Sequence, residues 1–130
     1  MSKLITSLVE NLNKIDENDF ESAALEIYNY QFHQNPIYNE FCVYLRRTPS
    51  NVKRLSEIPF LPIEFYKESI IKTGEWQPEI VFESSGTTGA QTSRNSIKDL
   101  KIYQSIIKSG FELFYGNPEE YVLLALFHST

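Results

Sequence analysis

The sequence predicts an α/β fold, in which a helical N-terminal part is followed by a β-loop-α-β unit of a mostly parallel sheet. Apolar residues recur at helical spacing up to about Arg47. A short apolar run, Ile80–Phe82, is expected to form a buried strand, and it leads into a loop rich in glycine and hydroxyl groups. Residues 121–127 then form a nearly continuous apolar segment. Strands that are apolar throughout are typical of parallel sheets with both faces covered.

The N-terminal part is expected to contain two clear helices. Asn18 or Asp19 caps the first, which runs toward Gln34. Its shared apolar face consists of Leu25, Tyr28 and Phe32. The second helix begins at Asn35-Pro36, a cap residue followed by proline at the first helical position. Its apolar stripe consists of Ile37, Phe41, Tyr44 and Leu45.

The second half is expected to alternate short strands with helices. Pro62 opens a short helix through Lys67, and residues 70–72 form a short strand. Ser96 caps a helix, with Asp99 completing a capping-box-like arrangement, and Gly116 ends it. The apolar stripe of this helix consists of Leu100, Tyr103, Ile107, Phe111 and Phe114.

These elements predict two regions, a helical one over residues 1–54 and the incomplete start of a larger α/β domain over residues 55–130. Two parallel strands do not make a stable sheet, and an apolar strand left at an edge invites aggregation. We therefore expect the chain to be the N-terminal piece of a larger fold, or to be completed by a partner. The alternative is a small, self-sufficient α/β domain whose helices cover the sheet.

Composition narrows the classes of protein. The chain has 130 residues, 42% of them hydrophobic, and a formal net charge of −5. Nucleic acid is a poor match for an acidic chain, because phosphates need Lys and Arg. The nearest basic cluster is interpreted as a solvated helix end and loop: Arg46, Arg47, Lys53 and Arg54. A single cysteine, Cys42, and the lack of a membrane span or signal peptide predict a soluble cytoplasmic protein.

The loop Ser84-Ser85-Gly86-Thr87-Thr88-Gly89 offers the clearest chemistry. Its two glycines let backbone N–H groups approach a ligand closely, and its four hydroxyls donate hydrogen bonds without adding charge. It follows a strand, so we expect it at the carboxyl end of the sheet, where such folds bind ligands. Successive N–H groups there can form an anion-binding nest, which suits a polyphosphate.

Other interpretations of this loop are weaker. The chain has no Gly-Lys dipeptide for a Walker A loop and no G-x-G for a dinucleotide motif. Gly86–Gly89 matches the G-x-x-G of KH domains, but that loop joins two helices and binds nucleic acid. A hydroxyl-rich surface turn is the alternative to phosphate binding.

The same residues resemble a known superfamily. Ser84–Gly89 is similar to the signature loop of adenylate-forming enzymes, which include acyl- and aryl-CoA ligases, luciferases and peptide-synthetase adenylation domains. Further segments extend the resemblance to roughly residues 55–127 and direct it to the acyl-protein synthetase (LuxE) family: Phe60–Lys67, Phe82–Gly89 with Ser93-Arg94, Phe111–Gly116 and Tyr121–Leu126.

The resemblance implies ATP-dependent activation of a carboxylic acid, of the long-chain fatty acid class, as an acyl-adenylate. In the LuxE family the acyl group then moves to an enzyme cysteine and on to a reductase partner. ATP and Mg²⁺ are the implied cofactors, and no catalytic residue is assigned. The implied ATP-binding residues are Ser84, Ser85, Gly86, Thr87, Thr88, Gly89 and Arg94.

This chain departs from the superfamily after the loop. Many members carry Pro-Lys there, whereas Ala90–Arg94 follows here, so Arg94 is either the cation for the phosphates or a surface charge. The acyl-accepting cysteine and the rest of the site are expected outside this chain, which alone is expected to be inactive. Two other functions stay open: a CoA ligase of the phenylacetate type, and a non-catalytic anion-binding or interaction module.

The remaining reactive side chains are interpreted one by one. Cys42 is expected to be a buried thiol and His33 a solvated or capping residue at a helix end. His128 follows the last expected strand, where a site role stays open, but two isolated histidines form no metal set. Glu83 either orients the loop or a metal-bound phosphate, or is a solvated carboxylate at the end of a strand.

Overall fold

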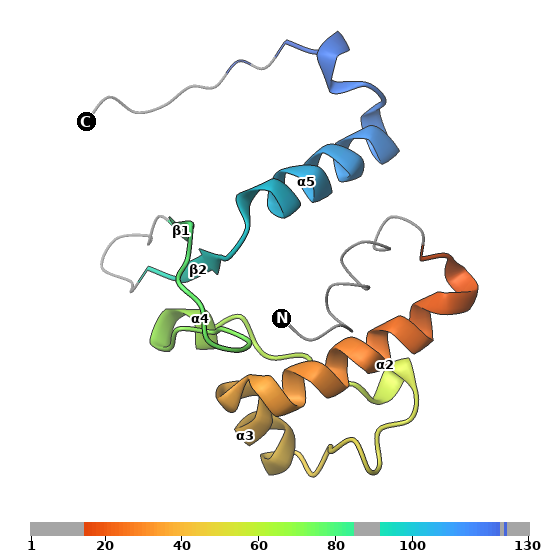
Figure 1. Cartoon of the computed structure of the whole chain (residues 1–130), viewed down its shortest axis with the longest axis vertical. Helices are drawn as coiled ribbons and strands as arrows, with labels where there is room; N and C mark the ends of the chain where they lie inside the picture. The colour runs from red at the N-terminus through yellow and green to blue at the C-terminus, as the bar shows by residue number, and fades with distance from the viewer. Residues whose placement is uncertain (1–14, 85–91, 123, 125–130) are drawn as a thin grey trace. The chain divides into compact units, whose positions relative to one another are not determined.

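The computed structural model describes residues 15–84, 92–122 and 124 and has mixed α/β content, as predicted. Figure 1 shows its helices and strands in chain order: α2 (Glu17–Gln34), α3 (Pro36–Tyr44), η2 (Leu55–Glu57), α4 (Phe65–Glu68), β1 (Ile80–Glu83), β2 (Arg94–Ile97), α5 (Leu100–Tyr115) and η3 (Pro118–Glu120). The chain divides into two compact units, Met1–Glu75 with Glu83–Asn95, and Trp76–Phe82 with Ser96–Thr130. The expected division between residues 54 and 55 stays a prediction.

Local capping defines α2 and α3. The carboxylate of Asp16 accepts hydrogen bonds from the backbone N–H groups of Asn18 and Asp19, at 2.8 and 3.1 Å. The predicted cap at Asn18 or Asp19 is therefore wrong, because several neighbouring residues are suitable caps and Asp16 is the one used. The prediction for α3 is confirmed: the Asn35 side chain accepts from the Tyr38 N–H, and Pro36 is the first helical residue.

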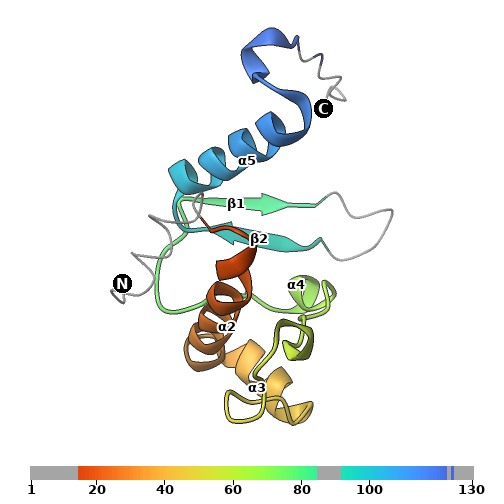
Figure 2. The same ribbon diagram turned by 90° about the vertical axis from the view of Figure 1, so that its right-hand side faces the viewer.

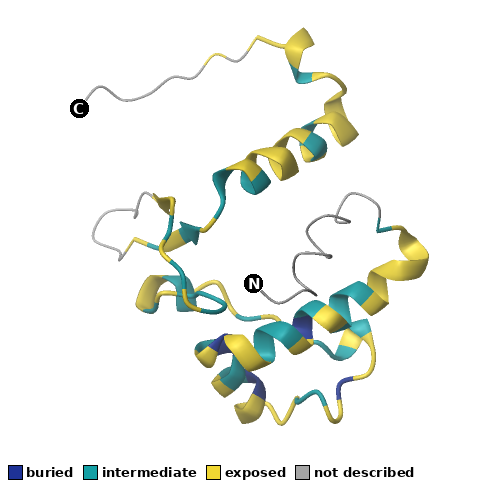
Figure 3. Cartoon of the chain, viewed as in Figure 1, coloured by how far each residue is buried: buried dark blue, intermediate teal, exposed yellow. Residues whose placement is uncertain are grey.

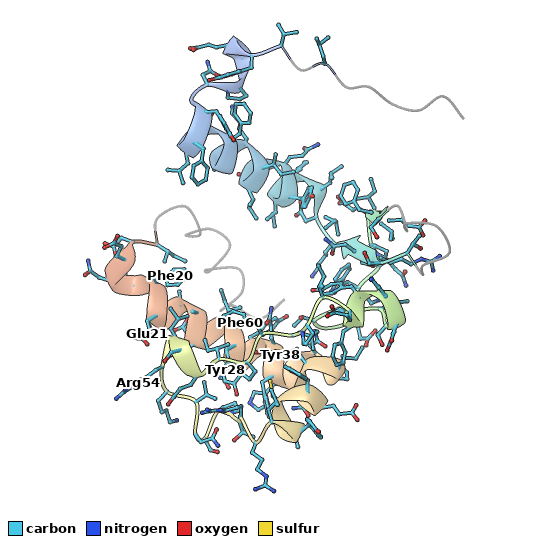
Figure 4. The ribbon with its side chains drawn as sticks, turned by 180° about the vertical axis from the view of Figure 1, so that it is seen from behind. Phe20, Glu21, Tyr28, Tyr38, Arg54 and Phe60 are labelled. Atoms are coloured by element: carbon cyan, nitrogen blue, oxygen red, sulfur yellow. The ribbon has the colours of Figure 1, made fainter. Side chains whose placement is uncertain are left out.

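The buried core of the first unit lies between α2, α3 and the connector that follows. It consists of Tyr28, Tyr38, Cys42 and Val52, with Leu25, Phe32, Phe41, Ile58 and Leu61 packed against it. The rings of Tyr28 and Tyr38 meet edge to face with centroids 6.2 Å apart (Figure 4). Their hydroxyls donate to the carbonyls of Arg47 and Pro59, at 3.1 and 2.6 Å. Both phenols are therefore buried without losing a hydrogen bond.

The apolar face predicted for α3 is partly wrong. Tyr44 and Leu45 are 83% and 43% exposed, whereas Tyr38 and Cys42 are buried and Phe41 packs beside them. Apolar side chains lie almost all around this short helix, so spacing alone allows more than one face to be chosen. The face predicted for α2, which contains Tyr28, is confirmed.

Strands β1 and β2 form a two-stranded antiparallel hairpin (Figure 2). The expected passage from strand through loop directly into a helix is therefore wrong, because a second strand intervenes. Ser96 lies in β2, and Asp99 caps α5 by accepting from the N–H groups of Lys101 and Ile102. Ile80, Val81 and Phe82 were expected to be buried but are about two-fifths exposed, because a two-stranded sheet covers them only in part.

The helix α5 is amphipathic but buries no residue completely. Figure 3 shows that buried residues of the described chain lie in α2, α3 and their connecting segments. Along the predicted stripe, Leu100, Tyr103 and Phe111 are half-buried, whereas Ile107 and Phe114 are exposed. Gly116 ends the helix with a φ of 82°, as its predicted capping role requires.

The remaining strand predictions are not confirmed in the described residues. Residues 70–72 form no strand, and α4 begins at Phe65 rather than at Pro62. Tyr121, Val122 and Leu124 lie outside any strand, and the rest of the segment 121–127 lies outside the described residues. The mostly parallel sheet thus stays a prediction.

Candidate functional site

The predicted phosphate-binding residues fall on the β1–β2 hairpin. Ser84 directly follows β1 and Arg94 begins β2. Ser85, Gly86, Thr87, Thr88 and Gly89 lie outside the described residues. The structure brings the two described members of the predicted site, Ser84 and Arg94, to the same end of the hairpin.

Two serines close the base of the loop. The Ser84 N–H donates to the Ser93 carbonyl at 3.1 Å, and the Ser93 N–H donates to Ser84 Oγ at the same distance. The two hydroxyl oxygens also lie 2.8 Å apart, within hydrogen-bonding distance. Ser84 therefore holds the two strands together at the point where the loop begins, which is a structural role in addition to its predicted role in ligand binding.

An ion pair lies beside these serines. Arg94 Nε donates to Glu83 Oε1 at 2.9 Å across the two strands. Both side chains face solvent, with exposed fractions of 62% for Arg94 and 53% for Glu83. Exposed pairs of this kind contribute about 0.2–1 kcal/mol to stability. The pair therefore adds little to folding, but it places a cation at the base of the loop.

The sequence did not indicate that Ser93 closes the loop or that Glu83, considered as a residue that orients it, pairs with Arg94. The strand Arg94–Ile97 is polar and lacks the alternating pattern of a half-buried strand, so the hairpin itself was not recognised. One signal was present: opposite charges flank the loop at Glu83 and Arg94, and opposite charges are favourable in cross-strand pairs. Recognising that pair would have predicted the hairpin.

The hairpin base suits an anionic ligand better than a bare metal ion. It presents a guanidinium and a pair of serine hydroxyls. One hydroxyl donates to the other, which leaves one hydroxyl hydrogen and the guanidinium N–H groups other than Nε–H as donors for phosphate oxygens. In the part of the chain that the structure describes, no group of three or more His, Cys, Asp or Glu side chains is placed to hold a metal ion. Mg²⁺ usually retains several waters and binds through substrate phosphates with one or two carboxylates, so a complete set of protein ligands is not required for it.

Cys42 is not suited to accept an acyl group. Its side chain is fully buried, as predicted, in the core beside Tyr38. Burial raises the pKa of the Cys42 thiol, which disfavours the nucleophilic thiolate. His33 lies in the last turn of α2, with its ring edge-on to Phe32, and His128 lies outside the described residues.

Comparison with known proteins adds no family assignment. No protein-family model matches the chain, and no curated protein or solved structure matches it. Every helix in the described ranges is too short or too polar to cross a bilayer.

Proposed function

We propose that this chain is the N-terminal part of an ATP-dependent acyl-activating enzyme of the acyl-protein synthetase type. In this proposal, the loop from Ser84 to Gly89 binds the phosphates of ATP, which carry a bound Mg²⁺. The carboxylate of a fatty acid then attacks the α-phosphate, which forms the acyl-adenylate and releases pyrophosphate. The observation that carries the proposal is the closure of the loop by Ser84 and Ser93, beside the guanidinium of Arg94. A loop rich in potential donors is thus tied at both ends.

Closure of the loop supports phosphate binding because a loop with joined ends loses less conformational entropy when it binds a ligand. A free segment with two glycines has many conformations to lose when it wraps a ligand. Hydrogen bonds between Ser84 and Ser93 remove part of that freedom in advance, which favours binding without adding a contact to the ligand. Donors to developing charge are most effective when they are held in place before the reaction.

The proposal includes a larger adenylate-forming fold around this chain. Val81, Ile107 and Phe114 are exposed in the described structure, although each is a large apolar residue. Further sheet and helix packed on these residues would bury them, and the acyl acceptor would also come from outside this chain, because Cys42 is buried. A CoA ligase of the phenylacetate type shares the proposed loop chemistry and differs in its acceptor, which is CoA rather than a cysteine.

Isothermal titration of the chain with MgATP tests the loop. We expect saturable binding that Gly86→Val weakens at least about tenfold and that Thr87→Val weakens less, because valine at Gly86 both restricts φ and adds bulk. Gly110→Val in α5 is the matched control, because a Cβ at Gly110 meets no atom within 4 Å. An affinity unchanged by Gly86→Val would contradict the phosphate-binding role.

Pyrophosphate exchange into ATP separates the enzymatic proposal from a non-catalytic binding module. The chain alone is expected to show no exchange with a fatty acid. A protein that also contains the missing half of the site is expected to show exchange that Gly86→Val abolishes. ATP binding without exchange in such a protein would favour the non-catalytic module.

A further inference from the structure

The ion pair at the base of the hairpin suggests a role for Glu83, and this inference rests on the proposed phosphate-binding function. We propose that Glu83 is a positioning residue, which holds the guanidinium of Arg94 from one side so that its terminal amino groups bind a phosphate of the polyphosphate ligand. The evidence for this role is the contact between the two side chains. Glu83 binds Arg94 through Nε, which leaves the terminal nitrogens of the guanidinium for a ligand.

Arg94 is held through Nε and not through its terminal nitrogens. The bond joins Nε to Glu83 Oε1 at 2.9 Å, and it uses one of the five N–H groups of the guanidinium. No other hydrogen bond from this guanidinium is found within the described residues. The terminal amino groups form the fork that binds phosphate in a bidentate manner. The pair thus occupies the side of Arg94 that a phosphate does not need.

The neighbouring contacts fix the backbone on which the pair is mounted. Ser84 and Ser93 are joined both through their backbones and through their hydroxyls, immediately next to Glu83 and Arg94. The two side chains therefore start from backbone positions that are held together. A long, solvent-exposed arginine otherwise loses much rotamer freedom on binding, and Glu83 removes part of that loss beforehand.

The carboxylate of Glu83 also repels an anionic ligand, which opposes the positioning effect. The direction in which affinity changes when Glu83 is removed therefore tests the proposal. Glu83 carries a negative charge close to where an anion would bind, so repulsion alone would make its removal strengthen binding. Positioning predicts the reverse, a weaker complex without Glu83. Glu83→Gln separates the two effects, because its amide oxygen can still accept from Nε while the charge is gone.

The experiment measures binding of inorganic tripolyphosphate and of ATP to the chain by isothermal titration calorimetry. We expect Arg94→Ala to weaken both about tenfold and Glu83→Ala about threefold, whereas Glu83→Gln keeps at least the original affinity. Glu112→Ala is the matched control, because it removes the same charge and breaks another exposed ion pair, Lys108–Glu112. Its affinity should be unchanged.

A double-mutant cycle completes the test. In the Arg94→Ala background, Glu83→Ala should cause no further loss, because Glu83 acts through Arg94. Tighter binding by Glu83→Ala, or an equal loss with and without Arg94, would overturn the positioning role. Weak binding by Glu83→Gln as well as by Glu83→Ala would also overturn it, because rescue by the amide is what separates positioning from a folding defect.

The loop variant distinguishes this inference from the function on which it rests. If Gly86→Val abolishes binding while Arg94→Ala leaves it unchanged, phosphate binding stands and the role of the ion pair is overturned. If the unaltered chain binds neither ligand, both proposals are overturned.

Discussion

The region of α2 and α3 encloses a core around two aromatic side chains, whereas the described residues of the region of β1 and α5 include no fully buried side chain. Tyr28 and Tyr38 are 3% and 5% exposed, while Phe114 and Tyr115 are 78% and 63% exposed. Both regions have capped helices and well-formed hydrogen bonds. The difference shows that local signals are sufficient to build the elements, but that a closed core needs a further segment to cover them.

The connector after α3 supplies that segment in the first region. Val52, Ile58 and Leu61 pack against the core formed by the two helices, and Glu21 of α2 accepts a hydrogen bond from the Leu55 N–H at 2.8 Å. In the second region, the ring of Phe111 contacts Tyr115 of the same helix and Tyr121 shortly after it. Tyr103 of α5 also meets the ring of Phe82 in β1, with centroids 5.3 Å apart, and the Leu100 N–H donates to Glu79 Oε2 at 2.7 Å. These few contacts bury no side chain of α5 completely, so we expect its caps to contribute much of its stability.

The largest effect should follow from removing a core ring. Tyr38→Ala is expected to lower the free energy of unfolding by about 3–5 kcal/mol, because it empties the space beside Tyr28 and Cys42 and leaves the Pro59 carbonyl without its donor. Tyr44→Ala on the same helix is the matched control and should change stability by no more than about 0.5 kcal/mol, since Tyr44 is exposed. Urea unfolding measures both. Equal losses would mean that the core has been placed on the wrong face of α3.

The sequence could predict the parts of this fold that depend on neighbours along the chain. Asn35-Pro36 specifies the start of α3 and Gly116 the end of α5, because capping involves only adjacent residues. The hairpin could not be predicted in the same way. Its second strand, Arg94–Ile97, is polar, and strand pairing joins residues that are distant in sequence.

The candidate site shows the same limit. The loop sequence identified Ser84 and Arg94 as candidates, but nothing in their spacing showed that Ser93 would close the loop or that Glu83 would hold Arg94 through Nε. Those contacts follow from the antiparallel register. The face of α3 was ambiguous for a different reason, because Tyr44 is as apolar as the buried residues and only tertiary packing decides between them.

A second, smaller loss of stability is expected at alkaline pH in the unaltered chain. The buried phenols of Tyr28 and Tyr38 resist ionisation in the folded state, whereas the same groups ionise more readily in the unfolded chain. Burial raises the pKa of Tyr28 to about 12 and also raises the pKa of Tyr38. In the unfolded chain a phenol has a pKa of about 10, so the unfolded state releases its protons first. The contribution of these tyrosines is complete below about pH 10 and is lost as the pH rises from there toward about 12.

Urea midpoints measured from neutral pH to about pH 11.5 check this prediction. The urea midpoint should fall with rising pH when unfolding of the α2–α3 region is followed. It should fall less steeply in Tyr28→Phe, which lacks one of the two phenols. A midpoint that stayed constant across this range would show that the two hydroxyls are not buried as described.

The smallest expected effects come from removing an N-cap side chain in each region, Asn35 of α3 and Asp99 of α5. The Asn35 side chain is buried, accepts from the Tyr38 N–H at 3.1 Å and donates to Thr73 Oγ1 at 3.4 Å, whereas the half-buried Asp99 serves only the N–H groups of α5 in the described structure. Asn35→Ala is expected to lower global stability by about 1–2 kcal/mol, and Asp99→Ala by about 0.5–1 kcal/mol confined to α5.

Amide hydrogen exchange distinguishes a confined effect from a shared one. With Asp99→Ala, the amides of α5 should exchange faster while those of α2 and α3 keep their protection, because a helix held by its caps opens by itself. With Asn35→Ala, protection should fall in α2 and α3 together, since the cap lies within their common core. If Asp99→Ala exposed α2 as much as α5, the two regions would unfold as one. The stability of α5 would then come from packing, and not from the local hydrogen bonds to which it is assigned here.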